Sequence, residues 1–289
     1  MGRVEHSLLG DVEERLMGEE TSIAWTDHTF NYWIGCTKIS PACDRCYAAA
    51  RDQRFEGGKH WGPGAPRRLT SRANRHSLRK WQAYAKLSGE RPWVFCFSLA
   101  DVFDNEVDPA WRKSFWKEVR VCDCLRIQLV TKRVGNAPDM LPDNWEEDFQ
   151  HCGIISTVVT SEEYRRDMPK LMAMKYDYHT RWIGLSIEPQ LEEIRLGNLG
   201  RRLDWVITGG ESDQVVDGKM ELGRPYDIDW ARALIDDGAR EGVPVFVKQI
   251  GATPQNGGHP MPLGGKRSPG ANPLLWPQDI RVREMPRVY

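Results

Sequence analysis

The stretch Trp182-Ile-Gly-Leu-Ser-Ile-Glu-Pro189 is an apolar run that ends abruptly in an acidic residue and a proline. Short apolar runs without strict alternation are typical of strands covered on both faces. Similar runs recur along the 289-residue chain and predict seven strands: Thr21–Trp25, Trp93–Leu99, Arg126–Thr131, Gly153–Thr160, Trp182–Ile187, Leu203–Thr208 and Val243–Val247.

Helical patterns separate several of these runs. The clearest are Pro109–Val121, Ser161–Lys175 and Asp229–Glu241, each of which carries an apolar stripe. Strands that alternate with helices indicate parallel βα units. The sequence therefore predicts an α/β fold, a partial or full (β/α) barrel of the TIM type, with a doubly wound open sheet as the main alternative.

Polar residues follow the predicted strands at the same relative position. In a (β/α) barrel these positions meet at the C-terminal mouth, where such proteins carry their chemistry. The residues concerned are Ser98, Asp101, Thr131, Lys132, Ser161, Glu162, Ser186, Glu188, Glu211, Lys248 and Gln249. Their common register favours the barrel over the open sheet.

The chain divides into three parts by composition. Residues 1–20 predict an N-terminal helical extension, residues 21–252 the barrel, and residues 253–289 an irregular C-terminal wrap rich in Gly and Pro. No apolar run reaches the roughly 18 residues of a membrane span, and the first residues lack the features of a signal peptide. We therefore expect no membrane association and a cytoplasmic location, where cysteines are thiols or metal ligands.

Residues 51–86 form a basic insertion in the predicted barrel. They include ten Lys and Arg residues against two acidic ones, whereas the whole chain has a net charge of −1. Such asymmetry suggests a phosphate-bearing partner, although a solvated basic helix face is an equal alternative. The candidate nucleic-acid or phosphate contacts are Arg67, Arg68, Arg72, Arg75, Arg79 and Lys80.

Three cysteines lie on one predicted loop, with six residues between Cys36 and Cys43 and two between Cys43 and Cys46. Three thiolates can take three corners of a 4Fe-4S cluster and leave the fourth iron open for another ligand. The alternative is structural zinc, which takes four ligands, and His28 or His60 would have to complete that site.

Several blocks of sequence together resemble a phage-associated protein family of unknown function related to radical S-adenosylmethionine (radical SAM) enzymes. The blocks run in order through the chain: Trp25–Asn31, Gly35-Cys36, Cys43–Ala48, Ser98–Phe103, Thr131-Lys132-Arg133, Leu185–Pro189, Trp205–Ser212, Arg224-Pro225 and Val247–Gly251. Two features depart from the commonest radical SAM pattern. The first cysteine spacing is longer, and Arg45 stands where an aromatic residue usually precedes the last cysteine.

The resemblance implies a barrel of the radical SAM type with Cys36, Cys43 and Cys46 as cluster ligands. It also implies S-adenosylmethionine bound across the strand ends. Lys132 is then the candidate for the cofactor carboxylate, with Lys248 as the alternative, and Ser186 and Glu188 for the ribose. Further cofactor contacts are assigned to Tyr47, Ser98, Gly209 and Gly210, and candidate catalytic roles to Asp101, Glu211 and Lys248.

The expected function is radical cleavage of S-adenosylmethionine, fed by an external electron donor. It would start isomerisation or functionalisation of a nucleic-acid-derived substrate, such as a hypermodified base in phage DNA, in the cytoplasm of the host cell. A non-catalytic, zinc-stabilised nucleic-acid-binding protein is the alternative. A cluster protein without radical activity is a third hypothesis.

Overall fold

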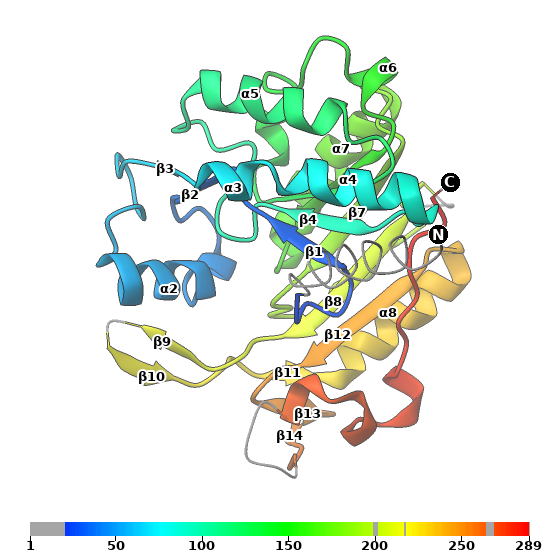
Figure 1. The fold of residues 1–289 in the computed structure, drawn as a ribbon. Helices are drawn as coiled ribbons and strands as arrows, with labels where there is room; N and C mark the ends of the chain where they lie inside the picture. Colours follow the sequence, from blue (N-terminus) through cyan, green and yellow to red (C-terminus); the bar gives the residue numbers. More distant parts are fainter. Residues whose placement is uncertain (1–20, 199–201, 217, 264–268, 289) are drawn as a thin grey trace, which may run out of the picture.

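The computed structural model describes residues 21–198, 202–216, 218–263 and 269–288. Its centre is a sheet of seven strands in which every neighbouring pair is parallel (Figure 1). In spatial order the strands are β1 (His28–Phe30), β4 (Trp93–Cys96), β5 (Arg126–Thr131), β6 (Cys152–Thr157), β7 (Trp182–Ile187), β8 (Trp205–Gly210) and β12 (Val245–Ile250).

The strand order follows the chain order from β1 to β12 without a reversal. In a doubly wound sheet the spatial order of the strands reverses at a switch point, so that alternative is wrong. The two outer strands, β1 and β12, do not pair with each other. The fold is therefore the partial (β/α) barrel, and the predicted fold class is confirmed.

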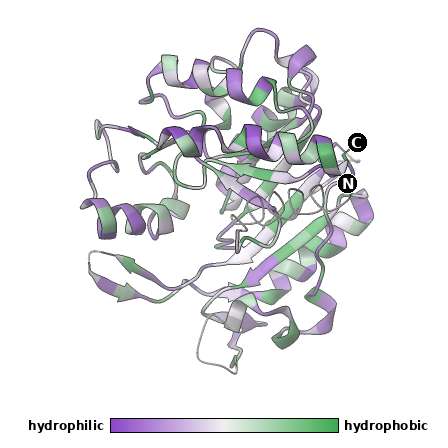
Figure 2. Cartoon of the chain, viewed as in Figure 1, coloured by the Kyte–Doolittle hydropathy of each residue, from purple (hydrophilic) through white to green (hydrophobic). Residues whose placement is uncertain are grey.

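Seven described helices accompany the sheet: α2 (Tyr47–Glu56), α3 (Arg72–Arg75), α4 (Ser77–Ser88), α5 (Pro109–Arg120), α6 (Trp145–Asp148), α7 (Ser161–Tyr176) and α8 (Ile228–Glu241). Buried side chains of α4, α5, α7 and α8 share one core with one face of the strands. Figure 2 shows the result, with apolar residues along the strands and polar residues toward the outside of the helices. None of the described helices has the length and apolar character to cross a membrane.

Short strands and turns complete the structure. The strands are β2 (Trp33–Ile34), β3 (Arg68–Leu69), β9 (Gln214–Val216), β10 (Lys219–Glu221), β11 (Tyr226–Asp227), β13 (Pro254–Asn256) and β14 (His259–Pro260). The 3-10 turns are Pro41–Cys43, Val134–Asn136, Pro269–Ala271, Pro273–Leu275 and Gln278–Ile280. The β9–β10 hairpin projects from the barrel beside α2 (Figure 1).

The predicted first strand is wrong. Residues 21–25 form a turn in which Thr26 N donates to Ile23 O at 3.3 Å, and the first strand starts only at His28. Trp25 instead enters the inside of the barrel, where it packs against Trp205 at 6.0 Å between ring centroids. The apolar side chain of Trp25 thus fills the barrel, and the segment does not pair as a strand.

Four tryptophans fill the barrel at the N-terminal ends of the strands: Trp25, Trp93, Trp182 and Trp205. The Trp93 and Trp182 rings meet edge to face at 5.7 Å. Gly153 makes room for them, because a Cβ there would lie 1.9 Å from the Trp182 ring. The opposite end of the barrel is left for polar side chains.

The C-terminal part of the chain covers the β12 edge of the sheet. Val247 N donates to Val282 O at 2.9 Å, and Glu284 N donates to Val245 O at 3.0 Å. An uncovered edge strand invites pairing with other chains, and this tail satisfies its hydrogen bonds internally. The predicted N-terminal helix over residues 1–20 lies outside the described residues.

Candidate active site

The three cysteines line one cavity at the C-terminal end of the sheet. Its volume is about 110 Å³. The side chains of Tyr47, Ser98, Asp101 and Lys132, all predicted site residues, line the same cavity. The structure therefore brings three separate segments, the cysteine loop and the ends of β4 and β5, to one place.

The cysteine loop follows β2 and ends where α2 begins. Gly35, just before Cys36, has a φ of +113°, and a Cβ there would lie 2.5 Å from His60 O. Only glycine accepts this conformation and this close approach. Ser40 caps the 3-10 turn Pro41–Cys43 by accepting from Ala42 N at 3.2 Å.

Arg133 holds Cys36 from the end of β5. Its guanidinium donates to Cys36 Sγ at 3.3 Å, to Thr37 O at 2.7 Å and to Asp101 Oδ2 at 3.3 Å. Burial raises the pKa of the Cys36 thiol to about 12, and the positive charge of Arg133 opposes this rise. A cation that already faces the sulfur suits a thiolate ligand, because metal binding requires the deprotonated form.

Asp101 supports this arrangement. It accepts from Thr131 Oγ1 at 2.7 Å and from Lys132 N at 3.0 Å, besides its ion pair with Arg133. Asp101 is 4% exposed. Its carboxylate thus joins the end of β4 to the end of β5.

Tyr47 connects the cysteine loop to β4. Its hydroxyl donates to the backbone carbonyl of Ser98. Phe97, the residue before, has a φ of +68°, which is rare for a bulky side chain. Asn31 fixes this bend by accepting from Leu99 N at 2.8 Å and donating to Ser98 Oγ at 3.0 Å.

Glu211 anchors the cysteine loop from the other side of the barrel. Arg224 donates to both of its carboxylate oxygens, with Nε 2.8 Å from Oε2, and also donates to Pro41 O at 3.1 Å. Arg45, between Cys43 and Cys46, lies 3.3 Å from Glu211 Oε2. Burial raises the pKa of Glu211, but the hydrogen bonds from Arg224 outweigh it, so the pKa lies below its ordinary value.

Glu188 and Lys248 form an ion pair inside the barrel, with Oε1 and Nζ 3.2 Å apart. Lys248 is the extra residue of a β-bulge, since Val247 pairs with Thr208 and Gln249 with Gly209. A bulge turns a side chain away from its regular direction. Gly209 lies beneath the pair, because a Cβ there would be 2.9 Å from Glu188 Oε1.

Ser186 and Gly210, two further predicted cofactor contacts on these strands, are buried. Ser186 is 4% exposed and lies on the same face of β7 as Glu188. A Cβ on Gly210 would lie 2.8 Å from the Ile250 carbonyl, so this glycine faces the backbone of β12. Glu188 Oε1 is buried, and its described partner is the Lys248 ammonium group.

The cysteines converge on the cavity but do not yet form a coordination shell. Within residues 21–198, 202–216, 218–263 and 269–288, no group of three or more His, Cys, Asp or Glu side chains is placed to hold a metal ion. The three thiols are of the right kind and number to be three ligands of a cluster.

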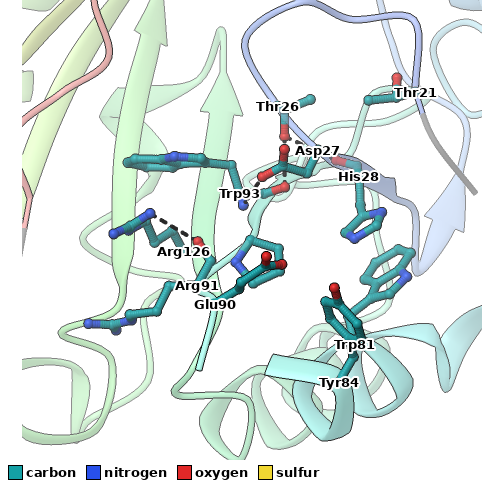
Figure 3. A pocket seen from close by; sticks show the side chains of 11 residues that line it. Thr21, Thr26, Asp27, His28, Trp81, Tyr84, Glu90, Arg91, Trp93 and Arg126 are labelled. Atoms are coloured by element: carbon teal, nitrogen blue, oxygen red, sulfur yellow. Dashed lines mark hydrogen bonds between the residues drawn. The ribbon is translucent and has the colours of Figure 1, made fainter. Parts of the chain in front are cut away.

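The histidines that a zinc site would need lie elsewhere. His60 is 8% exposed, and its Nδ1 is 2.8 Å from Asp52 Oδ1. His28 stacks on Trp81 at 4.3 Å in a different cavity of about 490 Å³ at the N-terminal ends of β1, β4 and β5 (Figure 3). Neither residue lines the cysteine cavity.

The predicted basic contacts are mostly used within the protein. The structure corrects the prediction for Arg67, whose side chain is 1% exposed and pairs with Asp104 at 2.8 Å. Arg68 pairs with Glu56 and Arg79 with Glu118, while Arg75 donates to Thr70 O. Within the described residues Arg72 and Lys80 are exposed, and no ion pair involves them.

The sequence missed three residues of this site as functional candidates. Arg133, Arg45 and Arg224 each contact the cysteine loop or its anchor. Arg133 stands directly after two predicted positions, so its place at a strand end was the available signal. Arg45 and Arg224 lie in blocks of the family resemblance, but their contact with Glu211, which is distant in the sequence, left no local pattern.

One solved structure of similar fold supports the architecture described above. Spore photoproduct lyase complexed with dinucleoside spore photoproduct matches with a TM-score of 0.50 at 12% identity, over 81% of this chain and 80% of that chain. A mutant of that lyase with bound AdoMet and dinucleoside spore photoproduct matches with a TM-score of 0.41 at 11% identity, over 82% and 60%.

No curated protein sequence matches the chain. The model of one protein family, described as "Protein of unknown function (DUF5131)", matches residues 20–274. The match spans most of the 289 residues. The chain therefore belongs to this family.

Proposed function

We propose that this protein is a radical SAM enzyme whose Cys36, Cys43 and Cys46 hold a 4Fe-4S cluster. The carrying observation is that all three thiols line one cavity at the C-terminal mouth of a partial parallel barrel, beside Tyr47 and Lys132. The bound cluster would pass an electron from an external donor to S-adenosylmethionine, releasing methionine and an adenosyl radical that abstracts hydrogen.

The residues around the cavity have separable roles in this proposal. Lys132 supplies a positive charge for the cofactor carboxylate at the end of β5, and no ion pair within the described residues occupies its ammonium group. Glu188, whose Oε1 forms the ion pair with Lys248, offers its carboxylate to a ribose hydroxyl. A hydroxyl that donates to this carboxylate would form a hydrogen bond to a charged group, which is stronger than one between neutral groups.

Arg133, Glu211 and Arg224 act as positioning residues. Arg133 orients Cys36, and the Glu211–Arg224 pair ties the loop at Pro41 to the far side of the barrel. Asp101 in turn orients Arg133. These contacts hold the three-cysteine loop over the strand ends, where the substrate would be attacked.

We propose a nucleic-acid-derived substrate that undergoes isomerisation or functionalisation, such as a hypermodified base in phage DNA. The lyase whose fold the chain resembles is complexed with a dinucleoside spore photoproduct, which agrees with this substrate class. The basic insertion, where Arg72 and Lys80 remain exposed, is a further support.

Anaerobic purification tests the proposal. We expect a brown protein with about four iron and four sulfide per chain, which releases 5′-deoxyadenosine when reduced with S-adenosylmethionine. Cys36→Ala should lose both properties. The matched control is Cys124→Ala, because Cys124 is partly exposed and outside the cavity. A colourless protein that contains zinc would overturn the proposal.

A further inference from the structure

A groove leaves the cysteine cavity on the side of β5 and α7. Its volume is about 370 Å³. Lys132 and Arg133 line both the groove and the cavity, so the two spaces are adjacent. Ile39, from the cysteine loop, lies on its wall. A ligand whose reactive part enters the cavity can therefore extend into the groove.

The groove is lined by cations. Lys132, Arg133, Arg166 and Lys170 face a single carboxylate, that of Asp167. Arg133 already donates hydrogen bonds to Cys36 Sγ and Asp101 Oδ2. The remaining three cations leave the groove with a net positive charge, which attracts an anion.

Two of these cations are held in place on α7. Asp167 Oδ1 accepts from Arg166 Nε at 3.0 Å and from Lys170 Nζ at 2.8 Å. The Asp167 side chain is only 5% exposed, whereas those of Arg166 and Lys170 are 49% and 44% exposed. The carboxylate lies behind the cations and orders them, which lowers the entropy cost of binding an anion.

Gly135 and Asn105 also line the groove. Gly135, in the turn after β5, lies beneath the Lys170 side chain, and a Cβ there would be 3.4 Å from Lys170 Cδ. Asn105 completes the lining as an exposed neutral polar residue. The groove thus combines ammonium groups with a guanidinium, which suits tetrahedral phosphate oxygens.

We infer that this groove binds a phosphate group of the substrate, while the attached nucleoside enters the cysteine cavity. The inference deepens the proposed function and rests on its nucleic-acid-derived substrate. It adds a phosphate contact beside the cavity to the exposed residues of the basic insertion, because Arg166 and Lys170 share the single carboxylate of Asp167 and keep an excess of positive charge.

The test is binding of a short fluorescein-labelled single-stranded DNA to the anaerobically purified protein, measured between about 50 and 200 mM salt. The double variant Arg166→Gln/Lys170→Gln should bind on the order of tenfold more weakly, with the slope of log affinity against log salt shallower by about 1.4. Arg165→Gln is the matched control, because Arg165 is exposed on the same helix outside the groove.

A gain of binding excludes misfolding as the explanation. Asn105→Lys adds a further cation to the groove and should tighten binding and steepen the salt slope by about 0.7. Leu87→Lys adds the same charge on α4, where Leu87 is 76% exposed, and should have a smaller effect. Equal effects of the two added lysines, or unchanged binding by the double variant, would overturn the inference.

Competition identifies the source of the phosphate. Displacement of the labelled DNA by thymidine 5′-phosphate supports a single nucleotide as ligand, and displacement by unlabelled oligonucleotide alone supports a strand. Because the readout is binding, a protein without radical activity still reports on the groove. Conversely, a protein that releases 5′-deoxyadenosine but ignores the groove substitutions overturns only this inference.

Discussion

Lys248 Nζ reaches Glu188 Oε1 at 3.2 Å by passing over Gly209, which lies on the strand between them. Three consecutive strands of the sheet therefore contribute to one polar contact. The bulge at Lys248 and the missing side chain at position 209 are both needed for it. The proposed ribose contact of Glu188 depends on this geometry.

Gly209→Ala should weaken binding of S-adenosylmethionine. The added methyl group would lie 2.9 Å from Glu188 Oε1 and displace the carboxylate from its contact with Lys248. We expect a loss of affinity on the order of tenfold, as for a removed hydrogen bond to a charged group. Calorimetric titration of the reconstituted protein measures it. Unaltered affinity in a variant with wild-type melting temperature would show that Glu188 does not contact the cofactor.

Glu211→Gln should reduce cluster occupancy. The neutral amide can no longer accept both guanidinium bonds of Arg224, and Arg45 also loses its anionic partner. The cysteine loop is then less firmly held. Iron content per chain after reconstitution is the measurement, and we expect a clear fall.

The control for this prediction is Glu221→Gln. Glu221 also pairs with Arg45, at 3.5 Å, but its side chain is 45% exposed, so the pair contributes little. Its iron content should remain that of the wild type. If both variants retain full iron, Glu211 does not position the loop.

Arg133→Met should lower the reduction potential of the bound cluster. The substitution removes a buried positive charge and the hydrogen bond to Cys36 Sγ, and both stabilise the more negative, reduced state. Redox titration followed by electron paramagnetic resonance measures the potential. Arg133→Lys should lower the reduction potential less than Arg133→Met does, because the positive charge is retained. A potential that is the same in all three proteins would contradict the assignment.

The buried carboxylate of Asp237 should make the free energy of unfolding depend on pH in the acidic range. Burial raises its pKa, but hydrogen bonds from Arg195, Leu196 N and Arg240 outweigh this, and the pKa falls to about 2. A lowered pKa stabilises the folded state above the unfolded value of 3.8. This contribution should disappear as the pH falls from about 4 to about 2.

Asp237→Asn therefore should lower the free energy of unfolding by about 1–2 kcal/mol at neutral pH, since its arginine partners are half exposed and screened. Urea unfolding at pH 7 and at low pH gives the comparison. Asp236→Asn changes an exposed neighbour and should have no such effect. A loss of equal size at pH 7 and below pH 2 would argue against ionisation as the cause.

The sequence predicted the central strands because burial on both faces leaves a strong local pattern. Arg126–Thr131 and Trp182–Ile187 coincide with β5 and β7. The failure at Thr21–Trp25 has a physical reason, since an apolar run does not show whether its residues pair or fill space. Trp25 fills the barrel.

The site could be predicted in outline only. Position after a strand identified Asp101 and Lys132, because parallel strands bring their ends together. The bulge that turns Lys248 inward depends on its register with β8, which no local pattern encodes. The burial of Arg67 likewise depends on Asp104, a partner 37 residues away.

The four tryptophans at the N-terminal ends of the strands give the barrel a sealed floor. Among the described residues this cluster fills the N-terminal end of the barrel, and the polar cavity lies at the opposite end. In the proposed chemistry, substrate would enter and product leave past the same cysteine loop. A nucleic-acid strand bound across that mouth would cover the cysteine cavity. The tryptophan cluster would shield a reactive intermediate from water at the N-terminal end of the barrel.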